Sequence, residues 1–207
     1  MTDLLIATAN PGKLQEFSEL LAGLPARLVS PVDLGLDGEV AETGETYAQN
    51  ARLKADALAS ASGLITLGDD SGLEVAALGG APGLFSHRYA GPGATDADRR
   101  RKLLDALKVV VPPRAAQFVC ALAVAWPGGE TRVFEGITPG EIALEERGSG
   151  GFGYDPIFYL RGQGATMAEL PPDLKNQLSH RARAVMAARG YLEALLAGSS
   201  ASWSDSR

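Results

Sequence analysis

Leu64-Ile65-Thr66-Leu67-Gly68-Asp69-Asp70-Ser71-Gly72 joins a short apolar run to two adjacent carboxylates that are flanked by glycines. The apolar run predicts a buried strand over residues 64–67, and the acidic step, residues 68–72, follows it directly. Because glycine lets the backbone turn sharply and come close to a ligand, a strand that ends in this way can present a carboxylate to a divalent cation. Asp, Ser and Gly are also ordinary turn formers, so the step taken alone fits a surface turn better than a metal site.

The segments around the acidic step alternate between strand and helix. Leu4–Ala7 is short and apolar, as expected of a strand, and the leucine spacing from Leu14 to Leu24 predicts a helix. A second helix is expected over about residues 46–60, shortly before the apolar run. After the acidic step, residues 73–78 alternate imperfectly as a strand, and the glycines and proline of residues 79–83 break it.

Two more helices are expected in the second half of the chain. Residues 95–98 (Thr-Asp-Ala-Asp) resemble a capping box and predict a helix to about Val109, with Arg99 to Arg101 on a solvated face. A last helical stretch is expected from about residue 179 to residue 196. The serine-rich tail, residues 198–207, is predicted to be disordered, which leaves one domain over residues 1–197.

A long hairpin is the main β-feature of the second half. Residues 115–126 and 131–137 are rich in β-forming side chains and flank the turn sequence Pro127-Gly128-Gly129. Since strands and helices alternate before this hairpin, a mixed sheet flanked by helices is the economical arrangement. The sequence therefore predicts an α/β protein with a long mixed central sheet, whose strand order the pattern does not fix.

Composition and charge limit the classes of protein. With 207 residues, 45% of them hydrophobic, the chain can bury one sizeable core. No apolar run approaches the roughly 18 residues that span a bilayer, and Met1-Thr2-Asp3 lacks the basic stretch of a signal peptide. The lone Cys120 suits a reducing compartment, and the net charge of −6 creates no field that attracts nucleic acid or an anionic membrane. We therefore expect a soluble cytoplasmic protein with neither of these partners.

The loop Asn10-Pro11-Gly12-Lys13 lies between the first expected strand and helix, where backbone N–H groups and the helix dipole favour a phosphate. It is not a Walker loop, because that motif needs glycine at Ala7 and Ser or Thr at Leu14. A simple strand-to-helix turn is the alternative interpretation, and the loop by itself does not decide between the two.

A glycine-rich segment, residues 148–153, matches G-x-G-x-x-G literally. Tyr154-Asp155-Pro156 follows it in place of the helix that a dinucleotide pyrophosphate requires, so a dinucleotide site is not expected. Phe152 and Tyr154 could instead stack on a planar base. The alternative is a loop whose two aromatic side chains pack in the core.

The start of the last helix carries a polar triplet, Ser179-His180-Arg181. Ser can cap the helix, while His180, Arg181 and the nearby Lys175 could donate hydrogen bonds to a purine or a phosphate. A merely capped helix start is the competing interpretation. One cysteine and two distant histidines give no zinc pattern, and no G-x-S-x-G nucleophile elbow is present.

Taken in order, these motifs resemble the inosine triphosphate pyrophosphatase family, whose bacterial members are XTP/dITP diphosphatases. The resemblance extends from about residue 3 to residue 196, and motifs in register are far more specific than any one alone. The matching segments are Thr8-x-Asn10-x-x-Lys13, Glu42-x-Gly44, Asp69-Asp70-Ser71-Gly72-Leu73, Leu78-Gly79-Gly80-Ala81-Pro82-Gly83, Gly151-Phe152-Gly153-Tyr154-Asp155-Pro156 and Ser179-His180-Arg181.

The resemblance implies a homodimeric, Mg²⁺-dependent enzyme with a long central sheet and an active-site cleft between two lobes. Such an enzyme hydrolyses aberrant purine nucleoside triphosphates (ITP, dITP and XTP) to the monophosphate and pyrophosphate, which cleanses the nucleotide pool. It also implies that Asp70 is the proton acceptor and a metal ligand, and that Glu42 is a second metal ligand. Asp69 and Lys54 are further candidates. The implied substrate-binding residues are Thr8, Ala9, Asn10, Pro11, Gly12, Lys13, Ser71, Phe152, Gly153, Tyr154, Asp155, Lys175, His180 and Arg181.

The residue types suit this chemistry. Water that attacks the α-phosphorus must lose a proton while negative charge gathers on the leaving pyrophosphate. A carboxylate near Mg²⁺ can orient that water, and Lys13 with the metal can stabilise the leaving group. Two alternatives stay open: a non-catalytic purine nucleotide-binding or sensing protein that uses the same loops, and a hydrolase of pyrimidine nucleotides on a related fold.

Overall fold

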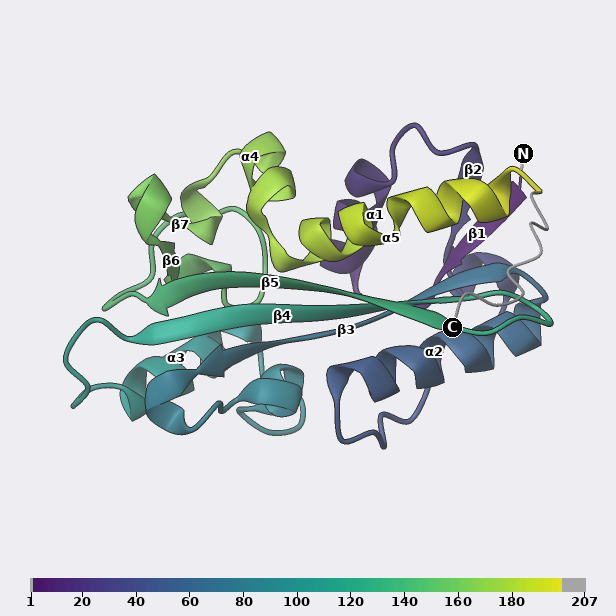
Figure 1. Cartoon of the computed structure of the whole chain (residues 1–207). Helices are drawn as coiled ribbons and strands as arrows, with labels where there is room; N and C mark the ends of the chain where they lie inside the picture. Colours follow the sequence, from purple (N-terminus) through teal and green to yellow (C-terminus); the bar gives the residue numbers. More distant parts are fainter. Residues whose placement is uncertain (1, 199–207) are drawn as a thin grey trace, which may run out of the picture.

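The computed structural model describes residues 2–198, which form a seven-stranded mixed sheet with helices on both of its faces (Figure 1). Short 3-10 turns link several of the main elements. These elements are β1 (Thr2–Ile6), α1 (Pro11–Leu20), β2 (Ala26–Val29), α2 (Tyr47–Ser62), β3 (Ile65–Val75), α3 (Asp96–Ala106), β4 (Ala115–Ala125), β5 (Arg132–Ile142), β6 (Phe158–Leu160), β7 (Ala165–Thr166), α4 (Pro172–Leu178) and α5 (His180–Leu196).

The strand order is β2-β1-β3-β4-β5-β6-β7. β1 runs parallel to both β2 and β3, as expected where a helix connects successive strands, and the remaining neighbours are antiparallel. β3, β4 and β5 are long enough to cross the whole molecule (Figure 1). The predicted α/β class with a long mixed sheet flanked by helices is confirmed.

The acidic step does not form a turn, which corrects the interpretation of residues 68–72. It lies inside one continuous strand, Ile65–Val75, that also takes up the first part of the separate strand expected over residues 73–78. The flanking glycines serve close packing. A methyl group added at Gly68 would lie 2.3 Å from the carbonyl oxygen of Ala51, and one at Gly72 would lie 2.5 Å from that of Gly83.

Helix boundaries in the second half differ modestly from the sequence prediction. α3 ends at Ala106, three residues before the expected end, and α4 (Pro172–Leu178) was not predicted. The expectation of a solvated face at Arg99 to Arg101 is wrong for Arg100, which is largely buried, and for Arg99. The Arg99 side chain is buried because its guanidinium donates hydrogen bonds to two backbone carbonyl oxygens and pairs with Asp96.

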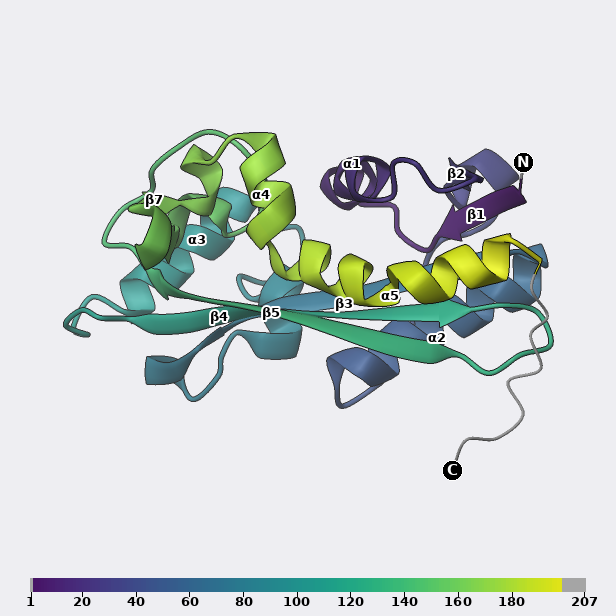
Figure 2. The ribbon, with the colours of Figure 1, turned by 45° about the horizontal axis from the view of Figure 1, so that its top comes forward.

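Different helices cover the two faces of the sheet (Figure 2). α1 and α5 share one apolar cluster with the sheet, in which Phe17 and Val185 are buried. On the opposite face α2 packs through Ala51, Ala55 and Ala59 against the alanines of β4. These small side chains let the α2 backbone approach β3 closely, which places the polar residues of α2 beside the acidic step.

The single domain over residues 1–197 and the division into two lobes stay predictions. The predicted disordered tail, residues 198–207, lies outside the described residues except for Gly198. Between residues 2 and 198, none of the helices combines the length and the apolar character that crossing a membrane requires.

Candidate active site

A cavity of about 940 Å³ opens where the loop after β1, the middle of β3 and the start of α5 meet. Every residue that the sequence assigned to catalysis, metal binding or substrate binding lines this cavity, except Gly12 and Lys175. Those two residues lie next to residues that line the cavity. A methyl group at Gly12 would lie 2.6 Å from the Phe152 ring, and Lys175 Nζ lies 2.6 Å from Asp155 Oδ2. The separate sequence motifs therefore converge on one cavity.

The phosphate loop, residues 8–13, is shaped by its own side chains. Asn10 caps α1, because its Oδ1 accepts a hydrogen bond of 3.1 Å from the Lys13 N–H, and its own N–H donates to Thr8 Oγ1 over 3.1 Å. Pro11 occupies the first helical position, where a missing N–H costs nothing. The result is a helix N-terminus that faces the cavity, with the Lys13 ammonium ion-paired to Asp69.

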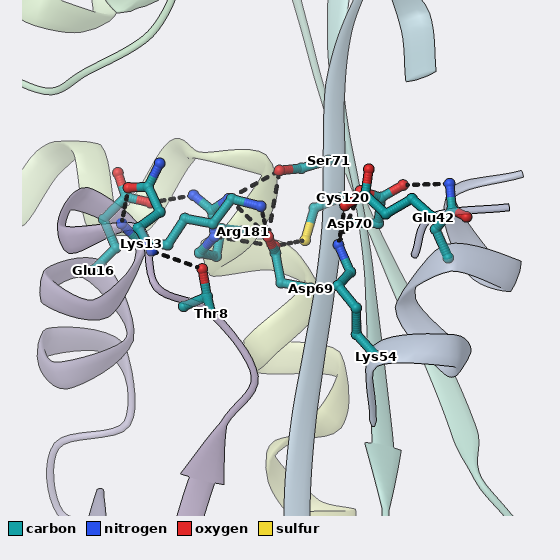
Figure 3. Close-up of polar contacts among 12 residues, drawn as sticks. Thr8, Lys13, Glu16, Glu42, Lys54, Asp69, Asp70, Ser71, Cys120 and Arg181 are labelled. Atoms are coloured by element: carbon teal, nitrogen blue, oxygen red, sulfur yellow. Dashed lines mark hydrogen bonds and ion pairs between the residues drawn. The ribbon is translucent and has the colours of Figure 1, made fainter. Parts of the chain in front are cut away.

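Asp69 and Asp70 face opposite sides of β3, because successive side chains of a strand alternate (Figure 3). Asp69 is buried among cations. Arg181 Nε lies 3.1 Å from its Oδ2, and Lys13 pairs with the same carboxylate. Burial alone would raise the pKa of Asp69, but Arg181 and Lys13 together hold that pKa well below its usual range. This carboxylate is therefore a fixed negative charge that orients two cationic side chains.

Asp70 faces α2 and the loop that carries Glu42. Its Oδ1 lies 3.1 Å from Lys54 Nζ, and the same ammonium lies 2.9 Å from Glu42 Oε1 (Figure 3). Asn50 Nδ2 donates to Asp70 Oδ2 over 3.3 Å. Burial raises the pKa of Asp70, and the negative charges of Glu42 and Asp69 oppose the effect of Lys54.

The arrangement of Glu42 and Asp70 is compatible with one Mg²⁺ ion. Across residues 2–198 no group of three or more His, Cys, Asp or Glu side chains is placed to hold a metal on its own. Both carboxylates nevertheless reach a single cationic atom, Lys54 Nζ, so they can converge on one positive charge. Mg²⁺ is commonly held by one or two carboxylates and completed by water and substrate phosphates, so this donor set fits it.

The opposite end of the cavity carries the aromatic loop, residues 151–155. Asp155 is buried, and its Oδ2 accepts from the Phe152 N–H over 2.9 Å, which fixes the backbone of the loop. The Lys175 ammonium lies 5.2 Å from the centroid of the Phe152 ring. Tyr154 packs in an apolar cluster, and its hydroxyl donates to the Ser86 carbonyl oxygen over 2.8 Å. Unlike Tyr154, Phe152 is not part of this buried apolar cluster.

His180 carries a buried ring nitrogen that has no hydrogen-bond partner. Its ring stacks on Phe118, with 4.6 Å between centroids, and its Nδ1 is buried without a hydrogen-bond partner. Burial and the neighbouring Arg181 lower the pKa of His180 to about 3, so the ring is neutral near pH 7. A buried polar atom without a partner costs free energy.

Several residues of the site were missed by the sequence analysis. Glu16 joins two elements, since it pairs with Arg181 and its carboxylate lies 2.7 Å from Lys175 Nζ. Its spacing of three from Lys13 placed it on the same face of α1, which is a signal that could have found it. Asn50 lies four residues before Lys54 and shares its helix face in the same way. Cys120, whose thiol donates to Asp69 over 3.1 Å, had no such signal because the contact depends on strand register.

The fold and the cavity together define an α/β protein that can bind a phosphorylated ligand at a helix N-terminus beside paired carboxylates. Comparison with known proteins makes the family plain. The model of the Ham1 family matches residues 4–191. This chain belongs to the Ham1 family.

Similar proteins support this membership along almost the whole chain. The dITP/XTP pyrophosphatase of Geobacillus kaustophilus is 50% identical over 89% of this chain and 91% of its own length. That of Bacillus subtilis is 46% identical over 94% and 98%. A HAM1 protein structure from Coxiella burnetii has a TM-score of 0.82 at 41% identity, covering 96% of this chain and all of that one (100%). The family resemblance drawn from the sequence motifs is confirmed.

Proposed function

We propose that this chain is a Mg²⁺-dependent pyrophosphohydrolase that converts dITP, XTP and ITP to the monophosphate and pyrophosphate. The observation that carries the proposal is that Asp69 and Asp70 line one cavity but have different partners. Asp69 is ion-paired with Arg181, whereas Asp70 lies beside Lys54 on the side of the strand where a metal ion can bind. Relatives that are 46–50% identical and named dITP/XTP pyrophosphatase support the same activity. Such an enzyme removes aberrant purine nucleotides from the cellular pool.

The phosphate chain binds along the phosphate loop in this proposal. Thr8, Asn10 and the Gly12 N–H at the start of α1 bind phosphate oxygens, and Lys13 stabilises the charge that gathers on the leaving pyrophosphate. When substrate enters, the Lys13 ammonium can turn from Asp69 toward the phosphates, because it is the more exposed partner of that ion pair. Ala9 and Pro11 complete the wall of the loop.

Asp70 acts as proton acceptor for the attacking water. Its carboxylate faces the cavity and is held by Lys54 and Asn50, so one oxygen can be directed at a water near the α-phosphorus. Glu42 and Asp70 would hold Mg²⁺, which supplies charge stabilisation to the phosphates when bound. Attack by water forms the new P–O bond as the bond to pyrophosphate breaks, and no covalent enzyme intermediate is needed.

Purine selection belongs to the other end of the cavity. Phe152 offers a ring for stacking, while Arg181 and Lys175 supply positive charge toward a 6-oxo group. Adenine presents an amino group at that position and would leave a buried donor unpaired, at a cost of about 1 to 3 kcal/mol for each mismatch. Ser71 and His180 also line the cavity.

The proposed assembly is a cytoplasmic homodimer of single-domain subunits. Large hydrophobic side chains exposed in the described chain, such as Phe85 and Val111, are available for a subunit interface. The net charge of −6 supports an enzyme that binds neither nucleic acid nor anionic membranes.

One product assay tests the activity. Incubation of the protein with ITP and Mg²⁺ is expected to release the monophosphate and pyrophosphate, with little turnover of ATP in a parallel reaction. Release of orthophosphate, or equal turnover of ATP, would contradict the proposal. Saturable ITP binding without any Mg²⁺-stimulated product would instead support the non-catalytic nucleotide-binding alternative.

A further inference from the structure

Gly153, at the centre of the aromatic loop, is held by α3 through both of its peptide groups. Its N–H donates to Asp96 Oδ2 over 2.9 Å, and its carbonyl oxygen accepts from Arg100 Nη1 over 2.9 Å. Its φ of +61° lies in the left-handed region that favours glycine. A methyl group added there would meet no atom within 4 Å, so backbone conformation rather than space requires glycine.

The two side chains that hold Gly153 are themselves fixed. Asp96 pairs with the buried Arg99, whose guanidinium also donates to the His87 carbonyl oxygen over 2.8 Å. Arg100 is largely buried and pairs with Glu146 at 2.9 Å. Charge-assisted hydrogen bonds of this kind are stronger than neutral ones. α3 is therefore a rigid support for the backbone of the aromatic loop.

Gly153 lies between Phe152, which faces the cavity, and Tyr154, which packs in the core. The Phe152 ring is confined on its other side by Gly12, because a methyl group there would lie 2.6 Å from the ring. The Phe152 backbone is tied to Asp155. The ring would therefore leave its position most easily through a change in the backbone conformation of Gly153. The two hydrogen bonds from α3 to Gly153 oppose that change.

We propose that Asp96 and Arg100 are positioning residues for base recognition, which act through Gly153 to hold Phe152 where a purine ring stacks. The inference rests on the proposed function and deepens it, since it concerns the same nucleotide site. A loop that is already ordered loses less conformational entropy on binding, so the contacts of Asp96 and Arg100 with Gly153 raise the affinity for the base. The phosphate end, with Lys13 and Asp70, belongs to other elements and does not depend on it.

The test compares Arg100→Ala with two matched controls. Arg101→Ala removes the neighbouring arginine, which is exposed and pairs only weakly with Asp98 at 3.4 Å. Glu146→Gln removes the other partner of Arg100 but leaves the contact with Gly153. Steady-state kinetics with ITP and inhibition by inorganic tripolyphosphate, which has no base, are measured for each protein. Arg100→Lys and Asp96→Asn, which keep a donor and an acceptor for Gly153, report on rescue.

For Arg100→Ala we expect KM for ITP to rise about tenfold while kcat changes by less than about twofold, as for the loss of one charge-assisted hydrogen bond. Inhibition by tripolyphosphate should not change. Both controls should match the wild-type protein. Arg100→Lys should recover most of the affinity for ITP that Arg100→Ala loses, and Asp96→Asn should retain most of the wild-type affinity.

Three results would overturn the inference. They are an unchanged KM for Arg100→Ala, an equal loss of affinity for ITP and tripolyphosphate, and a matching rise in KM for Arg101→Ala. If Arg100→Ala does not fold, as judged by circular dichroism, Asp96→Ala takes its place with the same expectations. A wild-type protein that binds ITP without turnover would contradict the proposed function alone, because calorimetric titration with ITP still compares the variants.

Discussion

Asp69 and Asp70 are neighbours in β3, yet one carboxylate is enclosed by Arg181 and Lys13 while the other meets Lys54 on the opposite side of the strand. The alternation of a strand thus divides two chemically identical side chains between two environments. The pKa of Asp69 is held below its usual range, whereas that of Asp70 is raised. The two residues should therefore respond differently to the same substitution.

Asp70→Asn is expected to abolish turnover of ITP and to leave stability nearly unchanged, because Lys54 keeps its contact with Glu42. Asp69→Asn should lower the free energy of unfolding by about 3 kcal/mol, since it leaves the buried Arg181 with Glu16 as its remaining charge partner. Urea unfolding and the product assay measure both effects. Near-normal turnover by Asp70→Asn would show that another group accepts the proton.

The sequence predicted most of the elements and the motifs of the site, because hydrophobic periodicity and turn residues act locally. It did not predict that the acidic step lies inside a strand, since the packing of Gly68 on α2 is a tertiary contact. The partners of Asp69 were also hidden. Arg181 is 112 residues away in the sequence, and Cys120 reaches it only through the register of β3 with β4. Local rules cannot supply such pairs.

Gly68→Ala is expected to destabilise the fold severely. The added methyl group would lie 2.3 Å from the Ala51 carbonyl oxygen and 2.7 Å from the Ala55 nitrogen, and neither backbone atom can move without shifting α2. Overpacking of this kind costs about 1 to 3 kcal/mol, and the backbone contact puts the value at the upper end. Thermal unfolding measures the loss, with Gly162→Ala as control because its methyl group would meet no atom within 4 Å. Equal melting temperatures for the two variants would contradict the packing argument.

His180 should make stability depend on pH. Its pKa is about 3 in the folded protein, against an ordinary value of 6.5, so the unfolded chain takes up the proton first as the pH falls. Its contribution to stability is therefore fully present above about pH 6.5 and is lost progressively toward pH 3, at about 1.4 kcal/mol per pH unit. The charged groups that face it, Arg181, Lys175, Glu16 and Asp69, do not reverse this direction.

The non-titrating variant His180→Asn isolates this effect. Between pH 7.5 and pH 5.0 the wild-type protein should lose about 2 kcal/mol more stability than the variant does. Urea unfolding at both pH values, followed by circular dichroism, measures the difference. Identical losses in the two proteins would show that the pKa of His180 is the same in the folded protein as in the unfolded chain.

Gly12→Ala should lower the affinity for ITP and cost only part of the free energy that overpacking usually costs. Gly12 lies in the first turn of α1, where alanine is the better helix former by up to about 1 kcal/mol. The same methyl group would lie 2.6 Å from the Phe152 ring, which must move away from the phosphate loop. We therefore expect a KM for ITP that rises at least about fivefold, and a net loss of stability of no more than about 2 kcal/mol, because the helix gain offsets part of the overpacking cost. Inhibition by tripolyphosphate, measured alongside, should change less than KM for ITP, because the ring serves the base and not the phosphates. A variant that binds ITP normally would show that Phe152 need not lie over Gly12 when the purine binds.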